Sequence, residues 1–594
     1  MNHHFQQTRW GLTDLLETPG GAPLQQALAD IESRTKNLEA ARERLAADMA
    51  ESEFLGLMRE YEELYAALNK IGAYGFLWFS EDTQNQTALS FKARMEQLAA
   101  DVTNRVLFFS LWWKELDHAN AERLMKNAGD WGYFLENERR MTPHTLKEGE
   151  EQVVNIKDVN GIGGLVTIYD MITSRYEFTL QVDGETHKLN REQLSTYVRH
   201  PSAEVRAAAY RELYRPFSQD GPVLARIYSN RVNDWKAEQV GLRHFTTPIS
   251  ARNLGNDVPD EAVETLLQVS RRNAPLFQRY FKLKGKWLGL VLMHRSDLYA
   301  PLAQAAEKEI PYPEAVELVL DSLNRFSAQV AQAARNVFEH NHIDSEVRAT
   351  KLGGAYCASI LPSMVPFVQT SYTGKARDVS VLAHELGHAV HAQMAREHSP
   401  LTFHSSLPMA ETASVFSEMI LNEQLLNAEK EATVRRDILA RMVDDAYATM
   451  LRQAYLVLFE QVAYPAIGEG QTMDELNALY LENLHEQFGD ALEVQDDFKW
   501  EWITIPHIYH TPFYTYAYSF GQLLTLSLYQ RYKQEGASFV PKYLKILAYG
   551  GSASPSQILG EAGIDIRSDQ FWQGGYDVVK GLIDQLEALE QVSA

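Results

Sequence analysis

The chain has 594 residues, of which 45% are hydrophobic and 23% are charged, a composition typical of a folded globular protein with a large core. Its formal net charge of −23 disfavours binding to nucleic acid or an anionic membrane and weakly favours cationic peptides at physiological salt. A single cysteine excludes an intrachain disulfide, residues 1–20 contain no apolar run, and the longest apolar stretches fall far short of the roughly 20 residues of a membrane span, so we expect a cytoplasmic protein.

Two long helices are predicted at the start of the chain. Apolar residues recur at heptad-like spacing through both halves of residues 20–75, which predicts a helical hairpin. Because the apolar run is short, packing within the protein is favoured over dimerisation through a coiled coil. Residues 1–115 are therefore assigned to an N-terminal helical region.

A β-hairpin is predicted further along the chain. Residues 176–189 are rich in β-prone side chains and contain Asp183-Gly184, a dipeptide typical of two-residue hairpin turns. We place this hairpin in a second region that spans residues 116–200. Helical patterns fill most of residues 201–594, which are assigned to a catalytic domain for the reasons given below.

A short β segment is predicted upstream of the most informative motif. Residues 365–372 are β-branched and aromatic, which predicts an edge strand. Such an edge can hold an extended peptide through main-chain hydrogen bonds, although an ordinary hairpin in a helical protein is the alternative. The preceding glycine pair permits close backbone approach, and the candidate substrate-binding residues are Gly353, Gly354, Ala355 and Tyr356.

The motif H-E-L-G-H at residues 384–388 predicts a metal site. A helix is expected here because apolar residues repeat every three to four positions and Asp378 is a plausible N-cap. Residues four apart lie on one helix face with Cβ atoms roughly 5–6 Å apart, so His384 and His388 can both bind one Zn²⁺ ion at about 2.0–2.1 Å. Glu385 is rotated off that line and is placed to act as a general base toward a metal-bound water.

Two histidines leave a third metal ligand to be found. A metzincin is excluded, because the third and sixth residues after the motif are His391 and Met394 rather than glycine and histidine. A carboxylate on a following helix is the common solution, and residues 408–418 have a helix-like pattern. Glu411 is the candidate ligand, and Glu418, two turns later, is a candidate to hydrogen-bond a ligating histidine. The alternative is that both glutamates are solvated.

A segment rich in histidine and tyrosine, residues 507–518, offers hydrogen-bond donors for the negative charge that develops on a peptide carbonyl oxygen during hydrolysis. Ring-rich stretches belong more often to a core than to a catalytic site. Tyr509 and Tyr518 are therefore assigned to packing.

Three segments together resemble the oligoendopeptidase F branch of the M3, thimet-oligopeptidase-like, metallopeptidases. They are KLGGAYCASILPSMVPFVQTSYTGKARDVSVLAHELGHAVH at 351–391, MAETASVFSEM at 409–419 and IPHIYHTPFYTYAYSFG at 505–521. The resemblance covers roughly residues 150–590 and, more loosely, the N-terminal helices. It departs at Ala389, where the family often has serine, which leaves the chemistry intact.

The resemblance implies a mostly helical, zincin-like fold in which two helical lobes enclose a deep substrate channel, with a small β-sheet beside the zinc helix. It also implies one Zn²⁺ ion per chain, a glutamate base and a histidine that faces the metal together with tyrosines. Transferred to this sequence, the metal ligands are His384, His388 and Glu411, the base is Glu385, and the facing residues are His507, Tyr514 and Tyr516.

The sequence thus predicts a zinc-dependent endopeptidase that hydrolyses internal bonds of short oligopeptides with a metal-activated water. A zinc carboxypeptidase or dipeptidase of similar helical fold is the main alternative, since it would use the same ligands. A metalloenzyme acting on a small molecule is less well supported, because the predicted strand and tyrosines suit a peptide. A helical scaffold with an inactive site is disfavoured because no ligand or base is missing.

Overall fold

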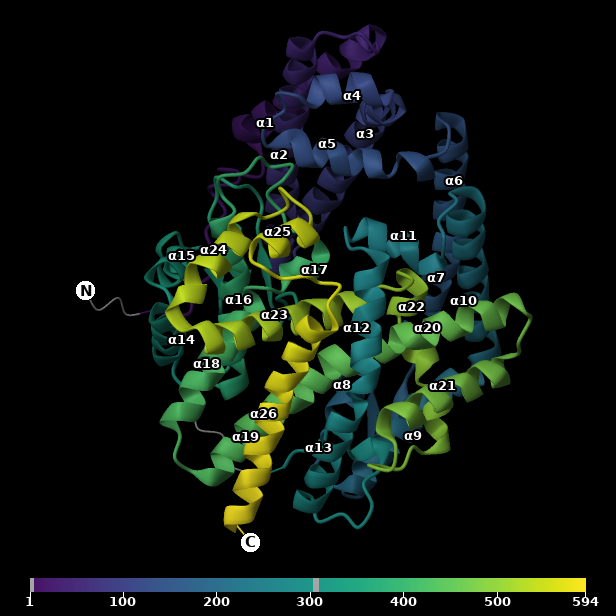
Figure 1. Ribbon diagram of the computed structural model, residues 1–594, viewed down its shortest axis with the longest axis vertical. Helices are drawn as coiled ribbons and strands as arrows, with labels where there is room; N and C mark the ends of the chain where they lie inside the picture. Colours follow the sequence, from purple (N-terminus) through teal and green to yellow (C-terminus); the bar gives the residue numbers. More distant parts are fainter. Residues whose placement is uncertain (1–4, 303–308, 594) are drawn as a thin grey trace. The chain divides into compact units, whose positions relative to one another are not determined.

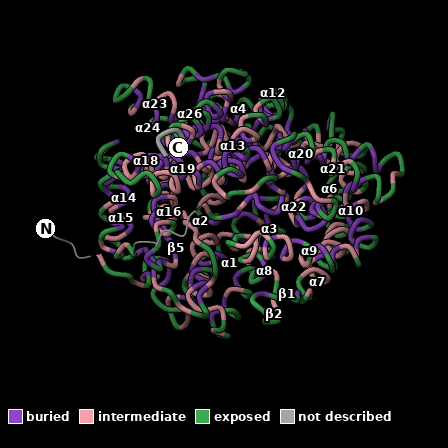
Figure 2. Tube along the Cα trace, turned by 90° about the horizontal axis from the view of Figure 1, so that it is seen from below, coloured by how far each residue is buried: buried purple, intermediate pink, exposed green. Residues whose placement is uncertain are grey.

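The computed structural model describes residues 5–302 and 309–593, with the backbone alone for residues 591–593. The chain is mostly helical, as predicted, and Figure 1 labels most of its helices along the sequence. It divides into two compact units, both of which contain buried residues. Figure 2 colours the chain by the burial of each residue. Unit 1 comprises Met1–Thr142, Glu307–Ala428 and Leu528–Asp565, and unit 2 comprises Pro143–Ala306, Glu429–Ser527 and Ile566–Ala594.

The predicted helical hairpin is confirmed at the start of unit 1. It consists of α1 (Gly21–Ala41) and α2 (Glu51–Glu81), against which α3 (Gln86–Glu115) packs. The heptad-spaced side chains of α1 are buried in a core shared by these helices, so this apolar face packs within the unit, as expected. The other helices of unit 1 are α4 (His118–Met125), α5 (Trp131–Arg140), α14 (Tyr312–Phe326), α15 (Ala328–Glu339), α16 (Ala376–Met394), α17 (Leu407–Ala410), α18 (Ser414–Ala428), α24 (Val540–Ala548) and α25 (Pro555–Glu561).

A three-stranded sheet lies beside α16 in unit 1. Its central strand is β5 (Phe367–Gln369), which pairs in parallel with β3 (Ile343–Asp344) and antiparallel with β4 (Tyr356–Ala358). The prediction that residues 365–372 form an edge strand was therefore wrong. The pairing partner β3 is only two residues long and carries no recognisable strand pattern, and β4 forms an edge of the sheet instead.

Unit 2 contains the predicted β-hairpin. Strands β1 (Phe178–Val182) and β2 (Glu185–Leu189) are antiparallel, and both turn residues, Asp183 and Gly184, have positive φ, as a type I′ turn requires. The helices of unit 2 are α6 (Glu148–Asn160), α7 (Ile162–Ser174), α8 (Arg191–Tyr197), α9 (Ala203–Gln219), α10 (Gly221–Trp235), α11 (Pro248–Gly255), α12 (Asp260–Arg272), α13 (Ala274–Trp287), α19 (Ala432–Ala446), α20 (Arg452–Gly468), α21 (Met473–Phe488), α22 (His507–His510) and α26 (Asp569–Ser593), while α23 (Tyr516–Glu535) contributes residues to both units.

Within residues 5–302 and 309–593, no helix combines the length and the hydrophobicity needed to cross a bilayer. The boundaries predicted near residues 115 and 200 separate consecutive stretches of the chain, whereas each compact unit combines three separate stretches. Those boundaries stay a prediction.

Helix α16 is the element on which the site is built. It begins at Ala376, two residues before the predicted N-cap, so Asp378 lies in its first turn rather than at the cap. The Asp378 carboxylate nevertheless caps the helix start, because its Oδ2 atom accepts hydrogen bonds from the backbone N–H groups of Thr373 at 2.7 Å and Lys375 at 3.2 Å. The apolar face of α16 packs mainly against α18 and also contacts β4 and β5.

Candidate metal centre

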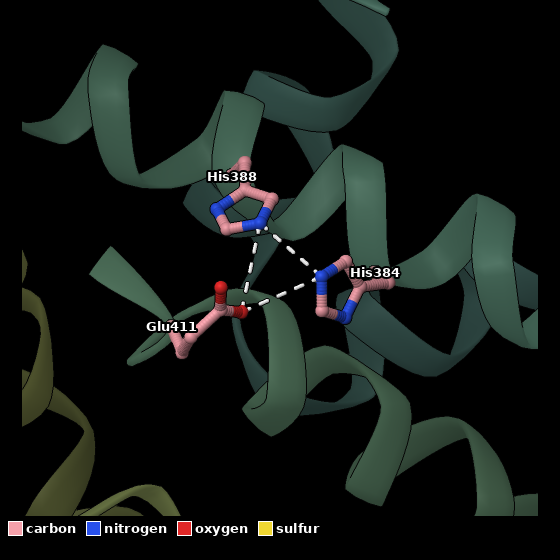
Figure 3. A group of neighbouring side chains, drawn as sticks. All are labelled: His384, His388 and Glu411. Atoms are coloured by element: carbon pink, nitrogen blue, oxygen red, sulfur yellow. Dashed lines mark hydrogen bonds and ion pairs between the residues drawn. The ribbon is translucent and has the colours of Figure 1, made fainter. Parts of the chain in front are cut away.

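His384, His388 and Glu411 converge within unit 1, as Figure 3 shows. The Nε2 atoms of the two histidines are 3.2 Å apart, and Oε2 of Glu411 lies 3.4 Å from His384 and 3.6 Å from His388. Ligands at 2.0–2.1 Å from one tetrahedral Zn²⁺ ion are about 3.3–3.4 Å from each other. The three atoms therefore have the spacing of one ligand set, and the residues fit a zinc ion.

Two further side chains orient the ligands. Glu418 Oε1 lies 2.5 Å from Nδ1 of His384, so that nitrogen is the donor and Nε2 is left to face the metal position. Ser414 donates a hydrogen bond to Oε2 of Glu411 at 2.6 Å. The Glu418 contact agrees with the prediction, whereas Ser414 was not singled out, although a hydroxyl three residues after the carboxylate could have indicated it.

Without a metal ion, the electrostatics of the centre are those of a crowded acidic pocket. Burial lowers the pKa of His384, but the Glu418 hydrogen bond and the neighbouring carboxylates more than offset it and raise the pKa to about 9. Burial lowers the pKa of His388 and keeps that ring neutral. A divalent cation would offset most of the negative charge of the three glutamates, which the donor set otherwise leaves uncompensated.

Glu385 lies beside the ligand set without joining it. The residue is 6% exposed, and burial, with the charges of Glu411 and Glu418, raises its pKa to about 7. A carboxyl group with such a pKa can accept and return a proton near neutral pH. Burial also raises the pKa of the nearby Cys357 thiol well above its usual range, which is the opposite of what a cysteine nucleophile needs.

A cavity of about 440 Å³ opens at the centre. His384, Glu385, His388 and Glu411 all line it, together with residues of β4 and of the loop between α16 and α17. Of the four predicted substrate-binding residues, Ala355 and Tyr356 line this cavity, whereas Gly353 and Gly354 are exposed and do not.

The segment that carries Glu411 differs from the predicted continuous helix. Helix α17 ends at Ala410, residues 411–413 form a turn, and α18 begins at Ser414. Glu411 thus lies at the C-terminal end of one helix and Glu418 lies on the next. Glu411 lies 3.4 Å from Nε2 of His384 and Glu418 lies 2.5 Å from Nδ1, so the two carboxylates contact opposite nitrogens of the ring.

Gly387, inside the motif, permits this approach. A Cβ atom at this position would lie 2.5 Å from the carbonyl oxygen of Ala413 and 2.6 Å from Cα of Ser414. Both are backbone atoms that cannot move aside cheaply. In the sequence, Gly387 is recognised only as part of the motif, although a glycine inside an otherwise apolar helix can indicate a close contact.

The histidine and tyrosine residues predicted to face the metal lie in unit 2. His507 stacks parallel to Tyr514 with ring centroids 6.0 Å apart, and Tyr518 OH is 3.5 Å from Nε2 of His507. Burial, together with Arg452 and His510, lowers the pKa of His507, so its ring is neutral at pH 7.

The surroundings of Tyr516 and Tyr518 differ from those expected from the sequence. Tyr516 is fully buried, and its hydroxyl accepts a hydrogen bond from Asn256 at 2.8 Å, so the structure does not bring it to the His507 group. Tyr518, assigned to packing, is half-buried beside His507, whereas Tyr509 is fully buried and stacks on Tyr169, as expected for a packing residue.

A buried carboxyl group supports the backbone just before Tyr514. Glu460 is fully buried, and its Oε1 atom accepts a hydrogen bond from the backbone N–H of Phe513 at 2.9 Å. Phe513 has a φ of +55°, a conformation that a bulky residue rarely adopts. Burial raises the pKa of Glu460 to about 8, so this carboxyl group is largely protonated at pH 7.

Comparison with known proteins places these features in a family. Residues 196–578 match the family model described as Peptidase family M3. The chain is 26% identical over 537 residues to the group B oligopeptidase PepB of Streptococcus agalactiae serotype III (strain NEM316), covering 89% of this chain and 88% of that protein. It is 23% identical over 592 residues to the oligopeptidase PepF of Bacillus subtilis (strain 168), covering 98% and 87%.

A solved structure has the same fold. The crystal structure of oligoendopeptidase-F from Enterococcus faecium aligns with a TM-score of 0.71 at 21% identity and covers 96% of this chain and 99% of that one. This likeness supports the mostly helical fold with small sheets, and the family match covers the metal centre as well as the His507 group.

Replacing Gly387 by alanine should separate α16 from the 411–413 turn. We expect overpacking to lower the free energy of unfolding by about 1–3 kcal/mol and to weaken metal binding, because Glu411 is displaced from both imidazoles. Gly72→Ala is the matched control, since a Cβ there meets no atom within 4 Å and should be neutral or stabilising. Thermal unfolding and zinc titration against a chelator measure both effects, and equal behaviour of the two variants would contradict the close-contact argument.

Glu418→Gln should weaken the metal site without removing a ligand. The glutamine keeps an oxygen near Nδ1 of His384 but loses the charge, so we expect zinc affinity to fall about 10- to 100-fold in chelator competition. Glu397→Gln, at a side chain 84% exposed, is the control. Unchanged affinity in Glu418→Gln would remove this carboxylate from the support of the ligands.

Glu460→Gln should change how stability depends on pH. In the unfolded chain this carboxyl ionises near its ordinary pKa of 4.5, whereas in the folded protein it stays protonated up to about pH 8. The wild type therefore loses stability as pH rises from 4.5 to 8, at up to about 1.4 kcal/mol per pH unit from this group. We expect the melting temperature of Glu460→Gln relative to wild type to rise between pH 5 and pH 8, and that of Glu469→Gln, exposed at the end of the same helix, to stay level.

Proposed function

The chain belongs to peptidase family M3 and is a metallopeptidase, and on this basis we propose that it is a zinc-dependent endopeptidase that cleaves internal bonds of short peptides. The observation that carries the proposal is the triangle of His384, His388 and Glu411, with the separate carboxyl of Glu385 beside it in one cavity. One zinc ion per chain and a cytoplasmic location form part of the same proposal.

Different residues of the protein bind the metal and transfer the proton during hydrolysis. A zinc ion held by His384, His388 and Glu411 would supply a Lewis acid that activates water at neutral pH. Glu385 accepts the proton of the attacking water and returns it to the amine nitrogen of the leaving peptide. Its carboxyl lines the same cavity as the three ligands without being one of them, which places it beside the attacking water.

Strand β4 supports binding of an extended peptide. It forms an edge of the sheet in the described part of the chain, and it begins at Tyr356, which lines the cavity. Backbone N–H and C=O groups on such an edge can pair with a substrate main chain whatever its side chains. This arrangement suits an enzyme that accepts many short peptides.

Donors to the developing oxyanion are the remaining part of the proposal, and they rest on resemblance to the family. His507 is the first candidate, because its ring is neutral and carries an N–H group. Tyr514 is the better tyrosine, since the Tyr516 hydroxyl is buried against Asn256. Loss of one such donor typically lowers turnover about 10²- to 10³-fold.

A carboxypeptidase is the alternative, and the charge of the cavity argues against it. The described lining residues include acidic and neutral polar side chains and neither lysine nor arginine. A C-terminal carboxylate held there would lack a counter-charge beyond the metal. This favours cleavage at internal bonds over removal of the last residue.

The test uses peptides of identical sequence with free or blocked termini. We expect the zinc-loaded enzyme to cleave acetylated, amidated peptides at an internal bond, with mass spectrometry of both fragments as the readout. Glu385→Gln should bind zinc as the wild type does and lose at least about 10²-fold in turnover, because the proton carrier is gone. Cleavage confined to peptides with a free C-terminus would favour the carboxypeptidase, and normal turnover of Glu385→Gln would remove this residue from its role.

A further inference from the structure

The loop between α16 and α17, residues 395–406, is anchored to distant parts of unit 1. His398 contacts Oδ1 of Asp130 through Nδ1 at 2.7 Å and the carbonyl oxygen of Ala548 through Nε2 at 2.8 Å. Both partners are acceptors, so both ring nitrogens donate. Thr402 donates a further hydrogen bond to Oδ2 of Asp130 at 2.6 Å. The loop is thus tied to the start of α5 and to the end of α24.

A glycine turn fixes the next part of this loop. The N–H of Gly551 donates to the carbonyl oxygen of Thr402 at 2.9 Å. A Cβ atom at Gly551 would lie 2.1 Å from the carbonyl oxygen of His404, and one at Gly550 would lie 2.4 Å from that of Phe403. Two backbones are therefore in direct contact, which only glycine allows. The loop therefore packs directly against the turn that follows α24.

The anchored loop presents His404 to the metal cavity. Phe403, His404 and Ser405 all line the cavity that contains the metal ligands and Glu385. Phe403 is 3% exposed and secures the loop in the core, whereas His404 is exposed within the cavity and its ring makes no hydrogen bond with any described residue. The backbone of His404 is held in place while its ring has no hydrogen-bond partner among the described residues, so the ring is available to a ligand.

The remaining lining restricts which ligand fits. Outside the catalytic set, the cavity offers neutral polar groups, among them Ser359 just after β4, His391 of α16 and Ser405 of the loop. A substrate carboxylate would face Glu385 and Glu411, and a substrate ammonium would find no carboxylate outside the catalytic set. An uncharged side chain with hydrogen-bonding groups meets partners there and brings no unpaired charge.

We propose that the loop and His404 form a subsite for one substrate side chain, adjacent to the scissile bond, that selects uncharged, hydrogen-bonding residues such as glutamine. His404 is the residue that determines this specificity, and Asp130, His398 and the Gly550-Gly551 turn are positioning residues that hold it. The inference rests on the proposed peptidase function and adds the substrate class to it.

The test compares nearly isosteric side chains at single positions. Internally quenched peptides carry glutamine, methionine or glutamate at each position flanking the cleaved bond. The wild type should prefer glutamine at one of these positions. In His404→Phe, which keeps a ring but has no hydrogen-bonding atom, kcat/KM for the glutamine peptide should fall about 3- to 12-fold while that for the methionine peptide is unchanged. His404→Asn, which retains a donor and an acceptor, should keep the preference.

A second measurement does not depend on turnover. Anisotropy of labelled peptides bound to Glu385→Gln, with and without His404→Phe, should show the same loss of glutamine preference in Kd. His118→Phe, at a side chain 82% exposed in the same unit, is the control and should change neither readout. If His404→Phe fails to fold, the smaller His404→Ala takes its place in both assays.

The outcomes distinguish this inference from the proposed function. Hydrolysis without any glutamine preference, or a preference that survives His404→Phe, would overturn the subsite and leave the peptidase proposal standing. An equal loss for all peptides in His404→Phe would also overturn it, because the residue would then act on the metal centre or the fold. A zinc-loaded wild type that cleaves no peptide would overturn both.

Discussion

The close approach of α16 to the turn at residues 411–413 is the constraint on which the centre depends. Two imidazoles on one helix can hold an ion only when a third donor reaches them from another element, and here that element touches the helix backbone at Gly387. A side chain one methyl group larger would occupy the space of the Ala413 carbonyl. The metal site is therefore a consequence of backbone packing as much as of its ligands.

A bound cation would offset the electrostatic cost of bringing these side chains together. Three glutamates and two histidines share a small volume. Burial, with the charges of Glu411 and Glu418, raises the pKa of Glu385, and the carboxylates raise the pKa of His384 against the effect of burial. Such a group is costly to assemble without a cation, so binding of the ion and folding of this region support each other. Glu385 remains the one carboxylate of the group with neither a ligand position nor a histidine partner, which leaves it free for proton transfer.

Much of this could be predicted from sequence because it depends on local spacing. The helix of His384 and His388, the hairpin at Asp183-Gly184 and the N-terminal helical pair follow from periodicities of a few residues. The rest depends on contacts between distant segments. The two-residue β3 that makes β5 central and the break after Ala410 have no local signal, and the glycine within the motif does not by itself show which backbone approaches it. Tyr516 and Tyr518 lie on the same helix and differ in which of its faces they occupy.

The anchoring of the α16–α17 loop separates two properties that enzymes often combine. In the proposed mechanism the metal ligands and the base belong to α16 and to the 411–413 turn, whereas the loop bearing His404 is held by Asp130 and by the glycine turn after α24. Selection among substrates could therefore drift through changes far from the motif while bond cleavage is preserved. In evolutionary terms, substitutions at the loop anchors would alter substrate preference without changing the residues of the metal centre.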